Sequence, residues 1–276
     1  MEHKNYESLT FTDSFMFNKV MLDMDICEKI LSLLLRTDIG PIDNIKCEEN
    51  IQVSAQNKPI RLDIFTKDDQ ACYDAEMQNR NNKSLESIAL PRRSRYYQSM
   101  IDIDAIDSGA GYRDLMDSNI IFICTFDPFG LGLPIYTFKN TCIEAPTLLL
   151  HDGCMKYFFN VTADPNKIPD DLKAFFRYTV EKKATDDLTR ELDSRINTYR
   201  TNESWRAEYM YFNIIEQDAK AEGREEGLAE GREEGLAEGR EEERSKTIRA
   251  INERDNALAE VERLKTILKE NGIKIE

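Results

Sequence analysis

One apolar run constrains the fold of this chain more than any other feature of its sequence. Residues 119–126 read NIIFICTF and are apolar at nearly every position. Side chains alternate between the two faces of a strand, so a continuously apolar strand must be covered on both faces. A sheet flanked by helices provides that cover. The run therefore predicts an α/β fold with a buried central strand.

Apolar spacing along the rest of the chain predicts the neighbours of this strand. Helical spacing indicates helices, and short β-like runs bounded by turn residues indicate strands. The expected elements are, in chain order, a helix at 11–36, strands at 46–54, 60–66 and 71–78, a helix at 86–106 whose regular part begins at Pro91, strands at 119–126 and 133–138, helical segments at 169–200, and a long helix from about residue 203. This order predicts an α/β fold with a mixed sheet.

Charge and composition argue against several classes of protein. The chain has 276 residues and a formal net charge of −15, so any binding of nucleic acid must rest on a local basic patch or on bound cations. No apolar run approaches the ~20 residues that cross a bilayer, and the first residues lack the apolar stretch of a secretion signal. The six cysteines form no CxxC pair and only two histidines are present, which disfavours zinc sites and Ser-His-Asp chemistry. We expect a cytoplasmic protein without membrane association.

Two carboxylates occupy unusual places in RLDIFTKDDQACYDAEMQNR, residues 61–80. If KDDQ forms the turn of a hairpin, Asp63 lies opposite Asp74. Asp63 and Glu76 then become diagonal neighbours on one face, with Cβ atoms ~7–8 Å apart. Facing carboxylates repel each other and resist ionisation, whereas a divalent cation between them removes the conflict. A metal site and a solvated sheet face are the two interpretations of this pattern.

Basic and aromatic residues follow the hairpin. They are Arg80, Lys83, Arg92, Arg93, Arg95, Tyr96, Tyr97 and Gln98. Arginine forks suit phosphate oxygens, and a tyrosine ring can stack on an unpaired base. The alternative is an ordinary helix surface whose tyrosines pack on the sheet. Two interpretations are open for Asp13 as well, which either caps the first helix or adds a carboxylate to the site.

The D-x12-E-x-Q pattern of the hairpin resembles the PD-(D/E)xK nuclease superfamily, and within it the Rpn-like branch of recombination-promoting nucleases and transposases. The likeness covers most of the chain. It is carried by the stretches TDSFMFNKVM, RLDIFTKDDQACYDAEMQ, PRRSRYYQSMI and IFICTFDPFGLGLPIYTF, and by the EGREEGLAEGREEG tail. It implies a restriction-endonuclease-like core, in which helices flank a mixed central sheet, followed by a long C-terminal helical tail.

The resemblance also implies an activity, that of a Mg²⁺-dependent DNA endonuclease associated with recombination or transposition, with Mn²⁺ as an alternative metal. Asp63, Glu76 and the backbone carbonyl of Met77 would hold the metal, which activates a water for attack on the phosphodiester. Gln78 stands where the superfamily has lysine; its amide can orient the water but cannot supply positive charge. The helix residues placed against DNA or the metal-bound water are Arg92, Arg93, Arg95, Tyr96 and Gln98. The competing interpretation is a catalytically degenerate nuclease fold that binds DNA or protein partners.

The tail contains three consecutive eight-residue repeats of the AEGREEGL type within 221–244. Each glycine weakens a helix by roughly 1 kcal/mol relative to alanine, so we expect a solvated, partly helical linker. Apolar residues beyond the linker approximate a short coiled-coil seam, which predicts a homo-oligomer; they are Ile251, Leu258, Val261 and Leu268. The expected divisions are a nuclease-like domain at 1–168, a helical extension at 169–215, the repeat linker at 216–244 and a C-terminal helix at 245–276.

Overall fold

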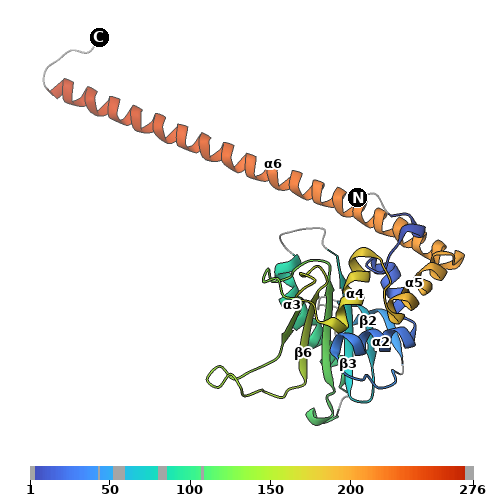
Figure 1. Cartoon of the computed structure of the whole chain (residues 1–276). Coiled ribbons are helices and arrows are strands. Elements are labelled where there is room, and N and C mark those ends of the chain that lie inside the picture. Colours follow the sequence, from blue (N-terminus) through green and yellow to red (C-terminus); the bar gives the residue numbers. More distant parts are fainter. Residues whose placement is uncertain (1–3, 43, 52–59, 80–85, 107–108, 271–276) are drawn as a thin grey trace. The chain divides into compact units, whose positions relative to one another are not determined.

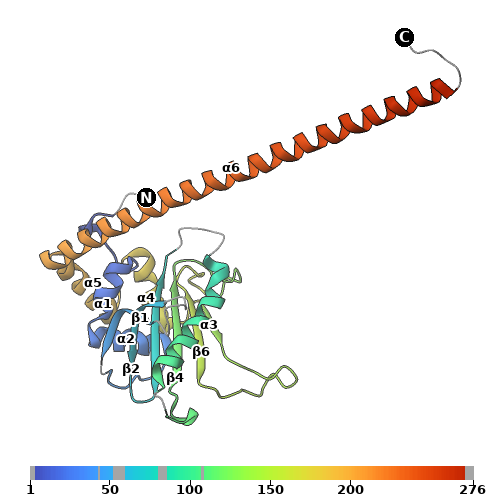
Figure 2. The same ribbon diagram turned by 180° about the vertical axis from the view of Figure 1, so that it is seen from behind.

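The computed structural model describes residues 4–42, 44–51, 60–79, 86–106 and 109–270. These ranges contain a six-stranded sheet flanked by helices (Figures 1 and 2). The strands are β1 (Ile45–Ile51), β2 (Ile60–Lys67), β3 (Ala71–Gln78), β4 (Asp117–Cys124), β5 (Ile135–Phe138) and β6 (Cys154–Asn160). The α-helices are α1 (Ser14–Met21), α2 (Met24–Leu35), α3 (Glu86–Ala105), α4 (Asp170–Glu181), α5 (Asp187–Arg200) and α6 (Glu203–Glu270), and short 3₁₀ helices span Tyr6–Ser8 and Tyr112–Asp114.

The sheet has the strand order β1-β2-β3-β4-β6-β5. β1, β2 and β3 form an antiparallel meander, β3, β4 and β6 run parallel, and β5 pairs antiparallel with β6. Parallel neighbours require a crossover connection, and α3 lies in the crossover between β3 and β4. The predicted α/β fold with a mixed sheet is confirmed.

The apolar run at 119–126 forms most of β4, and both of its faces are buried as predicted. Ile121 belongs to the core that the sheet forms with α1, α2, α4 and α5. Phe122, on the opposite face, belongs to the core under α3. Both side chains are fully buried. β3 and β4 therefore lie in the middle of the sheet, with helices covering each face.

The single helix predicted at 11–36 is wrong, because the structure divides this segment into α1 and α2. The break falls at Leu22 and Asp23, and Asp23 is the N-cap of α2. Its carboxylate accepts the Ile26 N–H at 3.4 Å. An aspartate in this position satisfies a backbone donor that has no partner inside the helix. Apolar residues keep helical spacing on both sides of the break, so spacing alone does not reveal it.

Other elements also differ from the expected ones. α3 begins at Glu86 and contains Pro91, which was expected to start its regular part. β6 is absent from the predicted elements, since Lys156 interrupts its apolar residues and no alternation marks the strand. β1 ends at Ile51, and the remainder of the predicted strand at 46–54 lies outside the described ranges.

The chain divides into two compact units, 1–209 and 210–276. The first unit includes α4 and α5, because Phe175 and Ile196 belong to the same core as α1 and α2. The described part of the second unit is the rest of α6, which is helical through all the repeats up to Glu270. The segment at 216–244, expected to be partly helical, is thus helix throughout.

Candidate functional site

The hairpin of β2 and β3 carries the predicted carboxylates in a register that differs from the expected one. The paired residues end at Ile64 and Ala75. One step further along the two strands, Asp63 is level with Glu76. The expected pairing of Asp63 with Asp74 is therefore wrong by two residues, although all three carboxylates still share one face of the sheet.

The turn explains the register. Asp68 Oδ1 accepts the N–H groups of Gln70 and Ala71, each at 2.8 Å. The Asp68 N–H in turn donates to the Ala71 carbonyl at 3.1 Å. An aspartate that binds backbone N–H groups two and three residues onward fixes a tight turn. The strands consequently pair from Lys67 and Cys72, and not from Thr66 and Ala71.

Two hydrogen bonds from backbone N–H groups to carboxylates link the strands at Asp63 and Glu76, beyond the last paired residues. Glu76 Oε1 accepts the Asp63 N–H at 2.9 Å, and Asp63 Oδ2 accepts the Met77 N–H at 3.2 Å. Each carboxylate thus accepts a backbone N–H at the position where the paired residues of β2 and β3 end. The two predicted metal ligands are direct neighbours, closer than the expected diagonal arrangement.

The second oxygen of Glu76 is held by two side chains. Arg93 Nη2, from α3, donates to Glu76 Oε2 at 2.7 Å. Gln78 Nε2, two residues along β3, donates to the same oxygen at 3.3 Å. The structure therefore brings together Asp63, Glu76, Gln78 and Arg93 at the carboxyl end of β3. In α/β sheets, ligands bind outside the carboxyl ends of the parallel strands.

Burial changes the protonation of these carboxylates. Burial raises the pKa of Glu76 to about 8; the nearby Asp63 charge contributes to the rise, and Arg93 opposes it. Burial also raises the pKa of Asp63, against the lowering effects of the Met77 N–H and of Arg93. Two carboxylates in a low-dielectric environment cannot both ionise easily. At neutral pH the pair therefore holds a proton that a bound cation would displace.

Asp74 is a further carboxylate of this site that the sequence interpretation did not select. It is fully buried on the Glu76 face of β3. Neither of its oxygens has a hydrogen-bond partner in the part of the chain that the structure describes. Burial raises its pKa well above the usual range, and the charges of Glu76 and Asp63 raise it further. The alternation in YDAEMQ places Asp74 on this face of the strand, but it does not reveal that the side chain is buried.

Glu48 of β1 is a second acidic residue that sequence reasoning missed. It follows Cys47, which pairs with Ile64, so that it lies beside Asp63 of the neighbouring strand. Its φ of 55° lies in the left-handed region. Arg61 donates to its carboxylate, and its charge contributes to the raised pKa of Asp63. The consecutive glutamates in IKCEEN are the signal that could have drawn attention to it.

The donor set at the hairpin fits one hard divalent cation. Mg²⁺ prefers oxygen ligands, keeps several waters and needs only one or two carboxylates from the protein. Asp63 and Glu76 supply two, and the unpartnered oxygens of Asp74 lie on the same face of β3. No group of three or more His, Cys, Asp or Glu side chains within the described ranges is arranged to hold a metal. Water or substrate oxygens would therefore complete the coordination.

The other predicted residues of α3 divide between surface and interior. Arg92 and Arg95 are exposed, and Tyr96 is half-buried. Gln98 is buried; its Nε2 donates to Asp102 at 3.0 Å, away from the carboxylate pair. Its Oε1 accepts no hydrogen bond from any described residue. The predicted residues Arg80 and Lys83 lie outside the described ranges.

Asp13 occupies the N-cap position of α1. Its carboxylate accepts the Thr10 N–H at 2.7 Å and also pairs with Lys4. Asp13 is thus the N-cap residue by position, but its side chain makes no cap hydrogen bond and is engaged in the turn before the helix. The segment nevertheless lies near the end of β3, since Asn79 Nδ2 donates to the Thr12 carbonyl.

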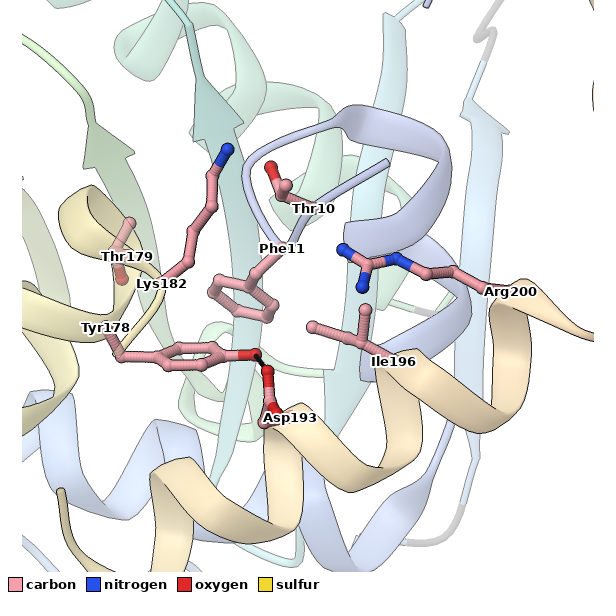
Figure 3. A pocket seen from close by; sticks show the side chains of 8 residues that line it. All are labelled: Thr10, Phe11, Tyr178, Thr179, Lys182, Asp193, Ile196 and Arg200. Atoms are coloured by element: carbon pink, nitrogen blue, oxygen red, sulfur yellow. Dashed lines mark hydrogen bonds between the residues drawn. The ribbon is translucent and has the colours of Figure 1, made fainter. Parts of the chain in front are cut away.

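A small cavity lies elsewhere in the first unit, between the segment at Thr10 and the helices α4 and α5 (Figure 3). Its volume of about 20 Å³ gives room for roughly one water molecule. Tyr178 crosses one side of it and donates to Asp193 at 3.2 Å. Its lining includes no residue of the carboxylate site, and its size excludes an organic substrate.

Comparison of the chain with protein-family models, with curated proteins and with solved structures finds no match. No helix in the described part of the chain is both long enough and apolar enough to span a membrane. A functional assignment must therefore rest on the residues and geometry of the site itself.

Proposed function

We propose that this protein is a Mg²⁺-dependent DNA endonuclease with a PD-(D/E)xK-type site, associated with recombination or transposition. One observation carries the proposal: Asp63 and Glu76 lie side by side near the carboxyl end of β3, where Glu76 accepts the Asp63 N–H and Asp63 accepts the Met77 N–H. Two adjacent carboxylates with raised pKa values, Glu76 buried and Asp63 half-buried, are costly to keep ionised unless a cation joins them. Such groups gather at functional sites.

The residues of the hairpin would have different roles in the reaction. Asp63 and Glu76, with the Met77 carbonyl, would hold Mg²⁺ or Mn²⁺. The bound metal would polarise the phosphodiester and lower the pKa of a coordinated water. Gln78 already donates through Nε2 to Glu76, which leaves its carbonyl oxygen as an acceptor that can orient the attacking water. The buried surroundings strengthen each of these electrostatic interactions.

The outer face of α3 would hold the DNA. Arg92 and Arg95 are exposed on this helix, and Tyr96 is half-buried beside them. Their guanidinium groups suit backbone phosphates, and the tyrosine ring can stack on an unpaired base. Local basic residues of this kind are needed because the whole chain carries a net charge of −15.

A catalytically degenerate nuclease fold is the second candidate. Gln78 in place of lysine favours it, because the strand lacks the usual cation. Such a protein would bind DNA or protein partners and self-associate through the C-terminal part of α6, residues 245–270. Along that helix Ile251, Leu258 and Val261 are exposed within their unit, as a coiled-coil seam requires before assembly.

Nicking of supercoiled plasmid separates the two candidates. The wild-type chain should convert supercoiled plasmid to open circles in Mg²⁺, and EDTA should stop the reaction. Asp63→Ala should remove the activity, whereas Asp69→Ala, which changes an exposed carboxylate in the turn of the same hairpin, should leave it intact. Metal-independent nicking, or equal nicking by Asp63→Ala, would refute the assignment. Absence of nicking together with DNA binding would favour the degenerate fold.

A further inference from the structure

The third position of the predicted catalytic motif carries no charge, which raises the question of where a site cation comes from. Gln78 is neutral, and phosphodiester cleavage builds negative charge on the phosphate in the transition state. The metal neutralises part of it. A nearby fixed cation would neutralise more. Within the described ranges, the arginine or lysine that contacts the carboxylate pair is Arg93, which comes from α3 and not from the strand.

Arg93 is fixed at the site more firmly than a surface arginine. Its Nη2 lies 2.7 Å from Glu76 Oε2, a carboxylate that is only 3% exposed. Its guanidinium carbon lies 5.2 Å from the ring centre of Tyr97 and 5.2 Å from that of Phe122. Arginine stacks on aromatic faces, and two such contacts restrict the orientation of its plane. Its side chain is 31% exposed, so part of it can still meet a ligand.

The donors of Arg93 are not all used within the protein. A guanidinium has five N–H donors in a rigid plane and stays charged at every relevant pH. Nη2 binds Glu76, but Nε is buried and has no hydrogen-bond partner among the described residues. A phosphate oxygen, which is a strong acceptor, can meet the part of the Arg93 side chain that remains exposed.

We propose that Arg93 is the cationic residue of the active site, contacting the scissile phosphate and replacing the charge that Gln78 lacks. This inference rests on the proposed nuclease function. It assigns Arg93 a role different from that of Arg92 and Arg95, whose exposed positions suit the flanking phosphates. The substitution of Gln78 for lysine is the main argument for a degenerate site. That argument fails if Arg93 of α3 supplies the positive charge that the strand lacks.

Relocating the charge tests the proposal. Arg93→Gln should reduce Mg²⁺-dependent nicking about a hundredfold, the loss typical of a removed transition-state donor. The double variant Arg93→Gln/Gln78→Lys should regain at least tenfold of that loss, because lysine then supplies the cation from β3. Arg177→Gln serves as the matched control: it breaks an arginine–glutamate contact of 3.0 Å on α4, and nicking should not change.

Two further measurements show whether Arg93 acts through its charge or only supports the structure of the site. Arg93→Gln should keep the rise in melting temperature that Mg²⁺ produces, since the metal ligands remain. The double variant should keep the same Mg²⁺-dependent rise, so that any regained nicking reports the added cation and not a restored metal site. If Arg93→Gln fails to fold, the double variant still decides: folding with cleavage supports the proposal, and folding without cleavage overturns it.

Failure of this inference differs from failure of the proposed function. A wild-type chain that nicks DNA while Arg93→Gln nicks equally well overturns the role of Arg93 alone. A double variant that stays as inactive as Arg93→Gln also overturns it, because position and not charge would then matter. A wild-type chain without Mg²⁺-dependent nicking overturns both proposals.

Discussion

Replacing Glu76 by glutamine should remove a large part of the pH dependence of stability from the metal-free protein. Burial raises the pKa of Glu76 from 4.5 to about 8 in the folded chain. The folded state therefore retains a proton that the unfolded chain has already released between these two pH values. Glutamine has no proton to lose, and it preserves the size and most of the hydrogen bonding of the protonated side chain.

The sign and size follow from linkage. Because the folded pKa is the higher one, this stabilisation is fully present below pH 4.5 and is lost as the pH rises through about 8. At about 1.4 kcal/mol for each pH unit, the loss is on the order of 5 kcal/mol. That is comparable to the whole stability of a marginal domain, ~5–15 kcal/mol. The metal-free wild type should thus unfold far more easily at pH 9 than at pH 5.

Urea unfolding in EDTA at pH 5, 6, 7, 8 and 9 measures this difference. The free energy of unfolding of the wild type should fall steeply across the series, and that of Glu76→Gln should fall much less. Glu203→Gln is the control, because its side chain is 83% exposed and its slope should match the wild type. Adding Mg²⁺ at pH 8 should restore the wild type and not the variant, since the metal binds the ionised carboxylate.

Parallel pH profiles of the wild type and Glu76→Gln would refute this reasoning. They would show that Glu76 titrates near its ordinary value in the folded chain. The low-dielectric site on which the metal proposal depends would then have to be abandoned. Equal stabilisation of both proteins by Mg²⁺ would place the cation elsewhere.

Asp74→Asn should leave stability at pH 5 nearly unchanged and raise it by about 1–3 kcal/mol at pH 8, because it removes a buried carboxylate whose raised pKa makes ionisation costly; urea unfolding at the two pH values checks this, and a loss at pH 8 would contradict it. Arg92→Ala/Arg95→Ala should weaken DNA binding and reduce the slope of log K against log salt by about one for each phosphate contact, with stability changed by ~1 kcal/mol or less; fluorescence anisotropy at several salt concentrations measures both, and an unchanged slope would place the DNA on another surface. Truncation after Tyr211 should keep metal binding and nicking while reducing the oligomer mass seen by sedimentation, because the seam residues at 251–268 are removed; loss of folding would show that the tail is required by the core.

Local sequence patterns determined the class of the fold and the faces of its strands. An apolar run without alternation predicted β4 and its cover on both sides, and the structure buries Ile121 and Phe122 on opposite faces. Alternation along YDAEMQ placed Asp74 and Glu76 on one face with Asp63. These properties follow from the two-residue period of a strand, which is independent of the rest of the chain.

The tertiary structure decided the register and the partners. Asp68 sets the turn through hydrogen bonds to Gln70 and Ala71, and a different turn would have shifted every cross-strand pair. Arg93 reaches Glu76 from a helix that begins eight residues after β3 ends. Burial of Asp74 depends on helix α3 and on both neighbouring strands. Such contacts join residues that no local period relates, so they arise only when the sheet and its helices pack together.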